Sequence, residues 1–199
     1  SGEAKPHILC LNQYFLSSYG QSATRPSDEW IAFDVSQNDI QVTMQAIEKL
    51  PFEKIGAFVF EPGNASGLVR LPPKELITFI ASKVKENGGL IVVDEVTTGI
   101  GRTGTWFGFE HYDIQPDIVA CGKGIGNGYP VSCVAMRDIL AERLLQSGFR
   151  YAQSHQNDPL GCAVVCAVLS QIQIDNLLEH AMQMGKFLIA QLDSVAQHN

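Results

Sequence analysis

The sequence contains no long hydrophobic run and no cluster of positive charge. No apolar stretch approaches the ~20 residues that a helix needs to cross a bilayer, and no signal-peptide pattern opens the chain. Acidic residues outnumber basic ones by 21 to 14, and the formal net charge is −7 at pH 7. Nucleic-acid-binding surfaces need clustered Lys and Arg, so we expect neither nucleic acid nor a membrane as a partner.

Cysteines are few and show none of the spacings that bind metal or build a disulfide framework. The five cysteines form no C-x-x-C pair, and Cys162 and Cys166 lie one helical turn apart. Their number is odd and their surroundings are mostly apolar. We therefore expect buried free thiols, no metal site and a reducing, cytoplasmic setting.

Short apolar segments alternate with helical patterns along the chain. Its 199 residues, 45% of them hydrophobic, are enough for one domain with a substantial core. Strands are predicted over residues 7–11, 30–35, 55–60, 90–93, 118–121 and 131–136. Helices are predicted over residues 39–50, 72–87, 138–146, 159–174 and 177–195. This alternation predicts an α/β fold of three layers, with a mostly parallel sheet and helices on both faces.

Two of the predicted strands deliver a charged residue at their carboxyl ends. Asp94 follows the apolar run 90–93, and Lys123 follows 118–121 after a single glycine. Open parallel sheets bind ligands just beyond these strand ends. Pyridoxal phosphate needs a lysine for its Schiff base and an acid against its ring nitrogen. A buried carboxylate stays ionised only beside a cation, so Asp94 and Lys123 predict a site for this cofactor.

The segments around these two residues resemble the signature of the class III aminotransferases. The matching segments are Asp94-Glu95-Val96, Thr98–Gly104, Gln115–Ile118 and Gly122-Lys123. The resemblance implies a fold-type I enzyme that depends on pyridoxal 5'-phosphate. It also implies that residues 1–175 form the large cofactor-binding domain, incomplete at its N-terminus. Residues 176–199 would form a helix that leads into a small C-terminal domain outside this sequence.

The resemblance assigns a role to each residue of the motif. Lys123 would form the internal aldimine with the cofactor and then carry a proton during the reaction. Asp94 would hold the ring nitrogen protonated, and Val96 would pack on one face of the ring. Thr97 stands where most relatives have a glutamine that bonds the phenolic oxygen of the cofactor. Arg102 resembles a structural arginine of the turn.

Three further residues match family positions outside this motif. Tyr14 would cover the other face of the ring, although Phe15-Leu16 replace the His-Gly of the family motif. Glu61 would lie close to the ring. Ser154 would reach the phosphate held by a neighbouring subunit, which predicts a homodimer with a shared active site. The helix over 159–174 is so apolar that we expect it to be buried in the sheet or against a partner.

The resemblance implies transfer of an amino group from an amino donor to an oxo acceptor. Aminomutases, decarboxylases and racemases of the same family use the same lysine and aspartate. Without the resemblance, Lys123 reads as a loop lysine, Asp94 as a turn cap, and Ser154 as a loop serine or helix cap. The chain also lacks a match to the family's phosphate cup and small domain. A non-catalytic α/β module is therefore the alternative interpretation.

Overall fold

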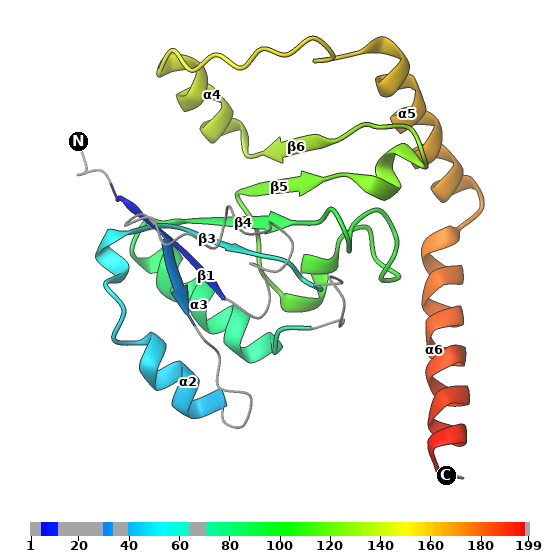
Figure 1. The fold of residues 1–199 in the computed structure, drawn as a ribbon, viewed down its shortest axis with the longest axis horizontal. Helices are drawn as coiled ribbons and strands as arrows, with labels where there is room; N and C mark the ends of the chain where they lie inside the picture. The colour runs from blue at the N-terminus through cyan, green and yellow to red at the C-terminus, as the bar shows by residue number, and fades with distance from the viewer. Residues whose placement is uncertain (1–4, 12–29, 34–39, 64–70, 198–199) are drawn as a thin grey trace.

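A six-stranded sheet forms the centre of the computed structural model, which describes residues 5–11, 30–33, 40–63 and 71–197 (Figure 1). The strands are β1 (His7–Leu11), β2 (Trp30–Phe33), β3 (Ile55–Phe60), β4 (Leu90–Asp94), β5 (Ile118–Cys121) and β6 (Cys133–Met136). Their order in the sheet is β2-β1-β3-β4-β5-β6. Every neighbouring pair is parallel except β5 and β6, which are antiparallel. The predicted mostly parallel α/β sheet is confirmed.

The described α-helices are α2 (Ile40–Ile47), α3 (Lys74–Glu86), α4 (Asp138–Gln146), α5 (Pro159–Ile174) and α6 (Leu177–Ala196). Of these, α2 and α3 connect consecutive strands, and the other three follow β6. Three short 3₁₀ turns are added: η1 (Phe52–Lys54), η2 (Gly108–Tyr112) and η3 (Lys123–Gly126). The turn η3 begins at Lys123 itself and includes Gly124 and Gly126.

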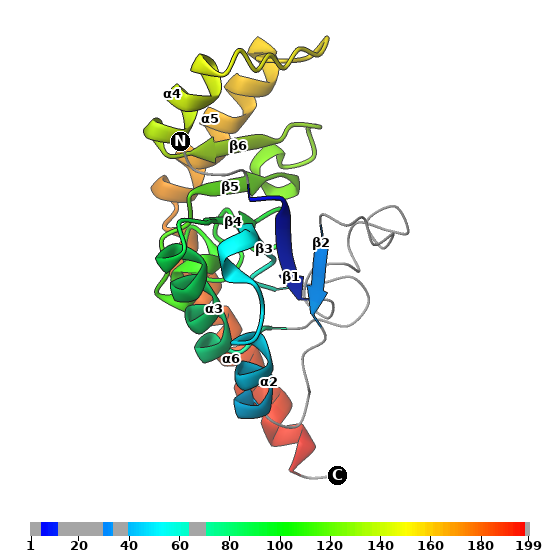
Figure 2. The same cartoon turned by 90° about the vertical axis from the view of Figure 1, so that its left-hand side faces the viewer.

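The main core lies between one face of the sheet and α3. Phe58 and Phe60 of β3 and Val93 of β4 point to this face and are fully buried. On α3 the buried side chains recur at helical spacing, and they are Leu76, Ile77, Ile80, Ala81 and Val84. Figure 2 shows α2 and α3 on the same side of the sheet. This packing fixes the positions of the central strands, whose carboxyl ends carry the predicted site.

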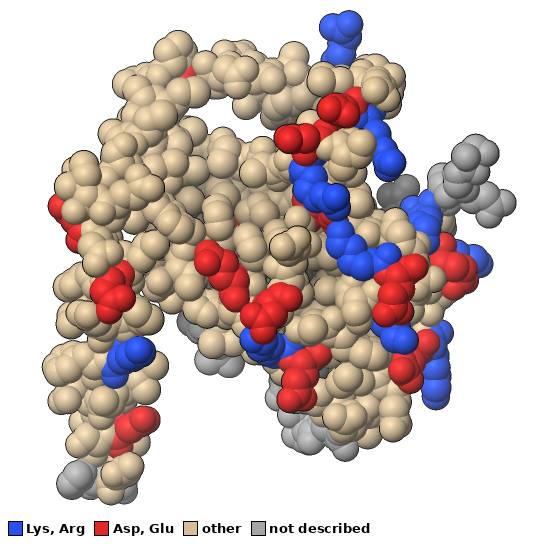
Figure 3. Space-filling model, turned by 180° about the vertical axis from the view of Figure 1, so that it is seen from behind, with Lys and Arg blue, Asp and Glu red and all other residues tan. Residues whose placement is uncertain are grey.

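Helices α5 and α6 extend away from this core (Figure 1). In α5 only Gly161 and Ile172 are buried, and Leu160 is 58% exposed. The expectation was burial in the sheet or against a partner; the first alternative is wrong, and the second stays a prediction. Figure 3 shows that few charged side chains lie on the arm formed by α5 and α6. In the first turns of α6, Leu178 and Met182 approach Gly101 and Gly104 of the loop after β4.

In the described part of the chain, no single helix is long and apolar enough to cross a membrane. Helices α5 and α6 together meet the length and composition criteria, but they are bent by 65° at the break between them.

The cysteines differ in their exposure to solvent. Cys10 and Cys121 are buried, as expected, but Cys133, Cys162 and Cys166 are exposed. The expectation of buried thiols is wrong for these three because β6 and α5 lie at the uncovered edge of the structure.

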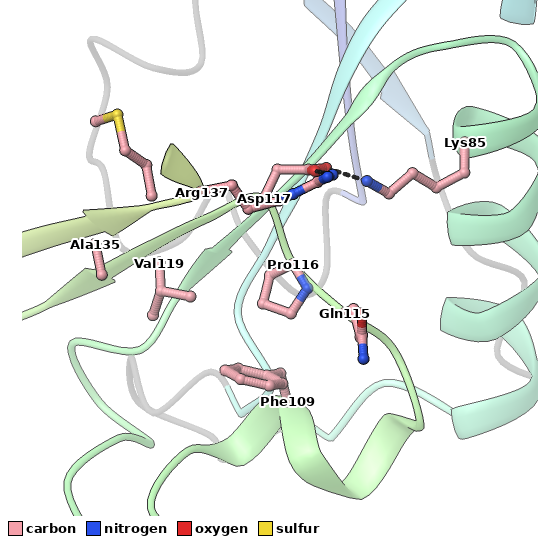
Figure 4. Close-up of a pocket in the computed structure, with 9 residues that line it drawn as sticks. Lys85, Phe109, Gln115, Pro116, Asp117, Val119, Ala135 and Arg137 are labelled. Carbon is pink, nitrogen blue, oxygen red and sulfur yellow. Dashed lines mark hydrogen bonds and ion pairs between the residues drawn. The ribbon is translucent and has the colours of Figure 1, made fainter. Parts of the chain in front are cut away.

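A buried ion-pair network holds the amino end of β5. The Asp117 carboxylate is buried and accepts bonds from Lys85 of α3 at 2.5 Å and from Arg137 at 2.9 Å (Figure 4). The backbone N–H of Ile91 in β4 donates to the same carboxylate at 2.8 Å. Burial alone would raise the pKa of Asp117, but these three donors hold it below its usual value. Asp117 therefore joins two strands and a helix.

These residues line a groove of about 530 Å³. The lining is formed by Lys85, Phe109, Gln115, Pro116, Asp117, Val119, Ala135, Met136 and Arg137. Because Asp117 directly precedes β5, the groove lies at the amino ends of the strands, opposite to Asp94 and Lys123. Its charged residues, Lys85, Asp117 and Arg137, are all engaged with one another in the ion-pair network, so we assign the groove a structural role.

The substitution Asp117→Asn should lower the free energy of unfolding by ~1–3 kcal/mol at pH 7, because buried donors lose their charged acceptor. The pKa of Asp117 is lowered in the folded chain. Its stabilisation is therefore present above the ordinary aspartate pKa of ~3.9 and is lost as pH falls through the lowered value. Urea denaturation of the wild type and of Asp117→Asn measures this. The difference in their free energies of unfolding should be smaller at acidic pH than at pH 7.

Asp113→Asn is the matched control, because the Asp113 side chain is 73% exposed and pairs with Lys74 on the surface. Surface ion pairs contribute little to the free energy of unfolding, so this variant should be nearly as stable as the wild type. Equal losses in both variants would contradict the role of Asp117.

Candidate active site

Asp94 is the last residue of β4 and is only 7% exposed. Its Oδ1 accepts a hydrogen bond from the backbone N–H of Val96 at 2.9 Å. Burial raises the pKa of Asp94, whereas the Val96 N–H and the positive charge of Lys123 act in the opposite direction. The carboxylate is therefore placed where a cation would stabilise its ionised form.

Lys123 lies beside the same turn. Strand β5 pairs with β4 so that Asp94 lies opposite Ala120, and Lys123 follows three residues later. Its Nζ donates a hydrogen bond to Thr97 Oγ1 at 3.1 Å. The backbone of Lys123 is left-handed, with φ of 45°, which costs a lysine of order 1–3 kcal/mol. The strained turn presents the amine at the sheet edge.

Val96 occupies the space between the two strand ends. A Cβ added to Gly122 would lie 3.3 Å from one methyl group of Val96 and 3.4 Å from the other. Such contacts are tight, so glycine allows the backbone before Lys123 to approach Val96 closely. The structure thus brings together four predicted site residues: Asp94, Val96, Thr97 and Lys123.

Glu95 shapes the turn that carries three of these residues. Its carboxylate is fully buried and accepts bonds from Thr98 Oγ1 at 2.6 Å, Gly108 N at 3.0 Å and Phe109 N at 2.7 Å. Burial raises the pKa of Glu95, and these donors partly offset that effect. No role was predicted for Glu95. Its position was informative, because alternate residues of an extended chain face opposite sides, so Glu95 points away from Asp94.

Arg102 links this turn to the loop of Lys123. Its Nη2 donates to the carbonyl of Val96 at 2.8 Å, and its Nε donates to the carbonyl of Gly99 at 3.0 Å. The guanidinium carbon lies 3.2 Å from the position of a Cβ on Gly124. Arg102 is thus a loop anchor, as its resemblance to a structural arginine predicts.

Glu61 lies at the neighbouring strand end. It directly follows β3, in which Phe60 pairs with Val93, so Glu61 stands beside Asp94 at the sheet edge. It is buried. The Tyr112 hydroxyl donates to the carbonyl of Pro62 at 2.7 Å and fixes this chain segment.

Ser154 is not brought to this cluster. Ser154 is exposed in the loop between α4 and α5, and within the described residues its hydroxyl makes no hydrogen bond to Asp94, Thr97 or Lys123. Tyr14 lies outside the described residues. Elsewhere in the described ranges, no group of three or more His, Cys, Asp or Glu residues could hold a metal ion.

The loop after Lys123 is tied to the start of α5. The Tyr129 hydroxyl donates to Asp158 Oδ2 at 2.8 Å, and the same oxygen accepts the N–H of Gly161 at 3.0 Å. These bonds lower the pKa of Asp158. Asp158 therefore caps α5 and also holds the loop that contains Lys123.

Comparison with known proteins places this arrangement in a family. The family model described as "Aminotransferase class-III" matches residues 12–199. An acetylornithine aminotransferase from Methanopyrus kandleri is 38% identical over 143 residues, which are 72% of this chain and 36% of that protein. The ethanolamine-phosphate phospho-lyase homolog 1 of Caenorhabditis elegans is 39% identical over 137 residues, or 67% of this chain and 29% of that protein.

Solved structures of transaminases share the fold. A transaminase from the marine bacterium Virgibacillus superposes with a TM-score of 0.84 at 28% identity, over 98% of this chain and 49% of that one. An (S)-enantioselective omega-transaminase from Thermomicrobium roseum superposes with a TM-score of 0.83 at 27% identity. The match covers 97% of this chain and 50% of that one. The chain belongs to the class III aminotransferases. It spans about a third of the curated relatives and about half of the solved chains.

Glu95→Gln should lower the free energy of unfolding by ~1–3 kcal/mol, because an amide NH₂ would face N–H donors that now reach a carboxylate. Glu110→Gln is the matched control. Glu110 is exposed and accepts one bond from Phe107 N at 2.8 Å, which an amide oxygen can also accept. Urea denaturation of both variants measures the difference, and a control variant as unstable as Glu95→Gln would contradict this role.

Proposed function

We propose that this chain is the central part of a pyridoxal phosphate-dependent aminotransferase that moves an amino group from an amino donor to an oxo acceptor. The observation that carries the proposal is that buried Asp94 and Lys123 lie at the same end of two paired strands, where the positive charge of Lys123 lowers the pKa of Asp94 against the effect of burial. The names of the relatives support it, among them acetylornithine aminotransferase and the putrescine aminotransferase of Pectobacterium atrosepticum. They favour a substrate with a primary amine on an alkyl chain.

The residues present fit the cofactor. Asp94 is a buried acid whose pKa is raised by burial, so a protonated ring nitrogen beside it would be stabilised as its ion partner. Val96 offers an apolar surface next to the backbone of Gly122. Lys123 supplies a primary amine within hydrogen-bond reach of Thr97.

When bound, pyridoxal phosphate supplies an aldehyde that bonds amines and a ring that accepts electrons from the substrate. Lys123 Nζ would hold the cofactor and, once released by substrate, take a proton from the substrate Cα and return it. The Asp94 carboxylate would keep the proton on the ring nitrogen. The Thr97 hydroxyl would orient the Lys123 amine, and Val96 would exclude water from one face of the ring.

The remaining predicted residues complete the proposal. Tyr14 would cover the second ring face, and Glu61 would border the site from β3. Ser154 would donate to the phosphate held by the partner in a C₂ homodimer. Residues 1–175 would form the large domain and 176–199 the approach to a small one. The exposed Ser154 loop supports the dimer, since its hydroxyl is accessible to a second chain.

One comparison favours a second candidate function. The similarity to the ethanolamine-phosphate phospho-lyase homolog supports elimination of phosphate from a phosphorylated amine at the same lysine. Release of inorganic phosphate from such an amine, without need for an oxo acceptor, would favour this reaction over amino transfer. A protein that shows neither reaction and binds no pyridoxal phosphate would be the non-catalytic module.

Lys123→Ala should abolish the pyridoxal phosphate adduct that borohydride traps on the protein. Trypsin cuts after Arg102, Lys123 and Arg137, and an adduct on Lys123 blocks the middle cut. The modified wild-type peptide should therefore span residues 103–137. Lys83→Ala is the matched control and should keep this adduct, because Lys83 lies on α3. An adduct on Lys74, Lys83 or Lys85 instead would refute the assignment.

Asp94→Asn should leave the trapped adduct in place and lower turnover of the complete protein. The loss should correspond to about 2–4 kcal/mol of transition-state stabilisation, as for one electrostatic contact in a dry site. Asp113→Asn, which changes an exposed aspartate, should leave turnover unchanged. Steady-state kinetics measure both, and undiminished turnover of Asp94→Asn would show that Asp94 is not the ring partner.

A further inference from the structure

Two cysteines face each other across the last two strands of the sheet. In the antiparallel pair of β5 and β6, Cys121 lies directly opposite Cys133. Residues that face each other in such a pair have Cα atoms about 4.5–5.5 Å apart, and disulfides join Cα atoms about 4.4–6.8 Å apart. Besides burial, the proximity of Cys133 contributes to the raised pKa of the Cys121 thiol. The backbone is therefore already placed for a bond between them.

The two thiols differ in accessibility. Cys133 is exposed, whereas Cys121 is buried in a small core with Ile125 and Ile172. Burial, followed by the proximity of Cys133, raises the pKa of Cys121 to about 12. An oxidant from solution would therefore reach Cys133 first, and Cys121 would act as the resolving thiol.

The pair closes the loop that carries the candidate catalytic lysine. Cys121 ends β5, Cys133 begins β6, and Lys123 stands two residues after Cys121. The strained backbone of Lys123 depends on how this loop is held at its base. A bond of about 2.05 Å between the two sulfurs would hold the base of the loop together. Because Gly122 is the single residue between Cys121 and Lys123, this restraint would act on the backbone of Lys123.

We propose that Cys121 and Cys133 form a reversible disulfide that restrains the loop of Lys123, with a small-molecule disulfide such as glutathione disulfide as the oxidant. The Cys133 thiolate attacks one sulfur of the oxidant and releases one glutathione. The Cys121 thiol then gives its proton to the released glutathione thiolate, attacks Cys133 Sγ and releases the second. Two cysteine thiols are oxidised, the oxidant is reduced to two thiols, and these take up the two cysteine protons. Transient bonds of this kind occur in reducing compartments as redox sensors.

Peptide mapping tests the bond without reference to the proposed function. The chain is equilibrated with glutathione disulfide, alkylated and digested with trypsin without reduction. Trypsin places Cys121 on peptide 103–123 and Cys133 on peptide 124–137. We expect these two peptides to be linked, and dithiothreitol to separate them. Stable glutathione on Cys133 with no linked peptide, or a link between other cysteines, would overturn the proposal.

Variants and a reactivity measurement complete the test. Cys133→Ser changes the exposed cysteine and should abolish the link. Cys121→Ala changes the buried cysteine and should abolish it too. Cys162→Ser, which alters an exposed cysteine of α5, should keep the link. Acylation of Lys123 in the folded chain should slow on oxidation, recover with dithiothreitol, and not change in Cys133→Ser. A linked wild-type chain with unchanged Lys123 acylation would overturn the restraint of the loop.

Discussion

The candidate site depends on one buried carboxylate, that of Glu95. Glu95 is fully buried, and three donors from two separate segments converge on it. It thereby fixes the turn after β4, so Asp94 on one side and Thr97 on the other face the sheet edge. Arg102 then connects this turn to the loop of Lys123. Three residues that would touch the cofactor are thus positioned by a neighbour whose own side chain points into the protein.

Two acids at opposite ends of the strands, Asp117 and Asp94, have opposite electrostatic environments. Asp117 at the amino ends is surrounded by donors and cations, and its pKa is lowered. Asp94 at the carboxyl ends is buried beside Lys123, and its pKa is raised. The first arrangement stabilises the fold, whereas the second leaves a carboxylate that a further cation would stabilise. This contrast distinguishes Asp117, which has a structural role, from Asp94, which we propose acts on a cofactor.

Most of the fold could be predicted from the sequence, because strands such as Ile55–Phe60 are short apolar runs between strong turn signals. The meeting of Asp94 and Lys123 followed from the rule that parallel strands present their carboxyl ends at one edge. The role of Glu95 could not be predicted, because its donors lie 13 and 14 residues away in sequence. The sequence left two surfaces open for α5, the sheet or a partner, because an apolar composition does not reveal which surface covers a helix; the sheet does not bury it. Ser154 stays a prediction, because its assigned partner belongs to another chain.

The central claim is that the turn held by Glu95 places Asp94 beside the ring nitrogen of one pyridoxal phosphate and Lys123 beside its aldehyde. A crystal structure of the protein grown with pyridoxal phosphate tests it most directly. We expect continuous density from Lys123 Nζ to the cofactor, and a ring nitrogen about 2.7–2.9 Å from an Asp94 oxygen. Cofactor bound in the groove beside Asp117, or joined to a different lysine, would contradict the claim.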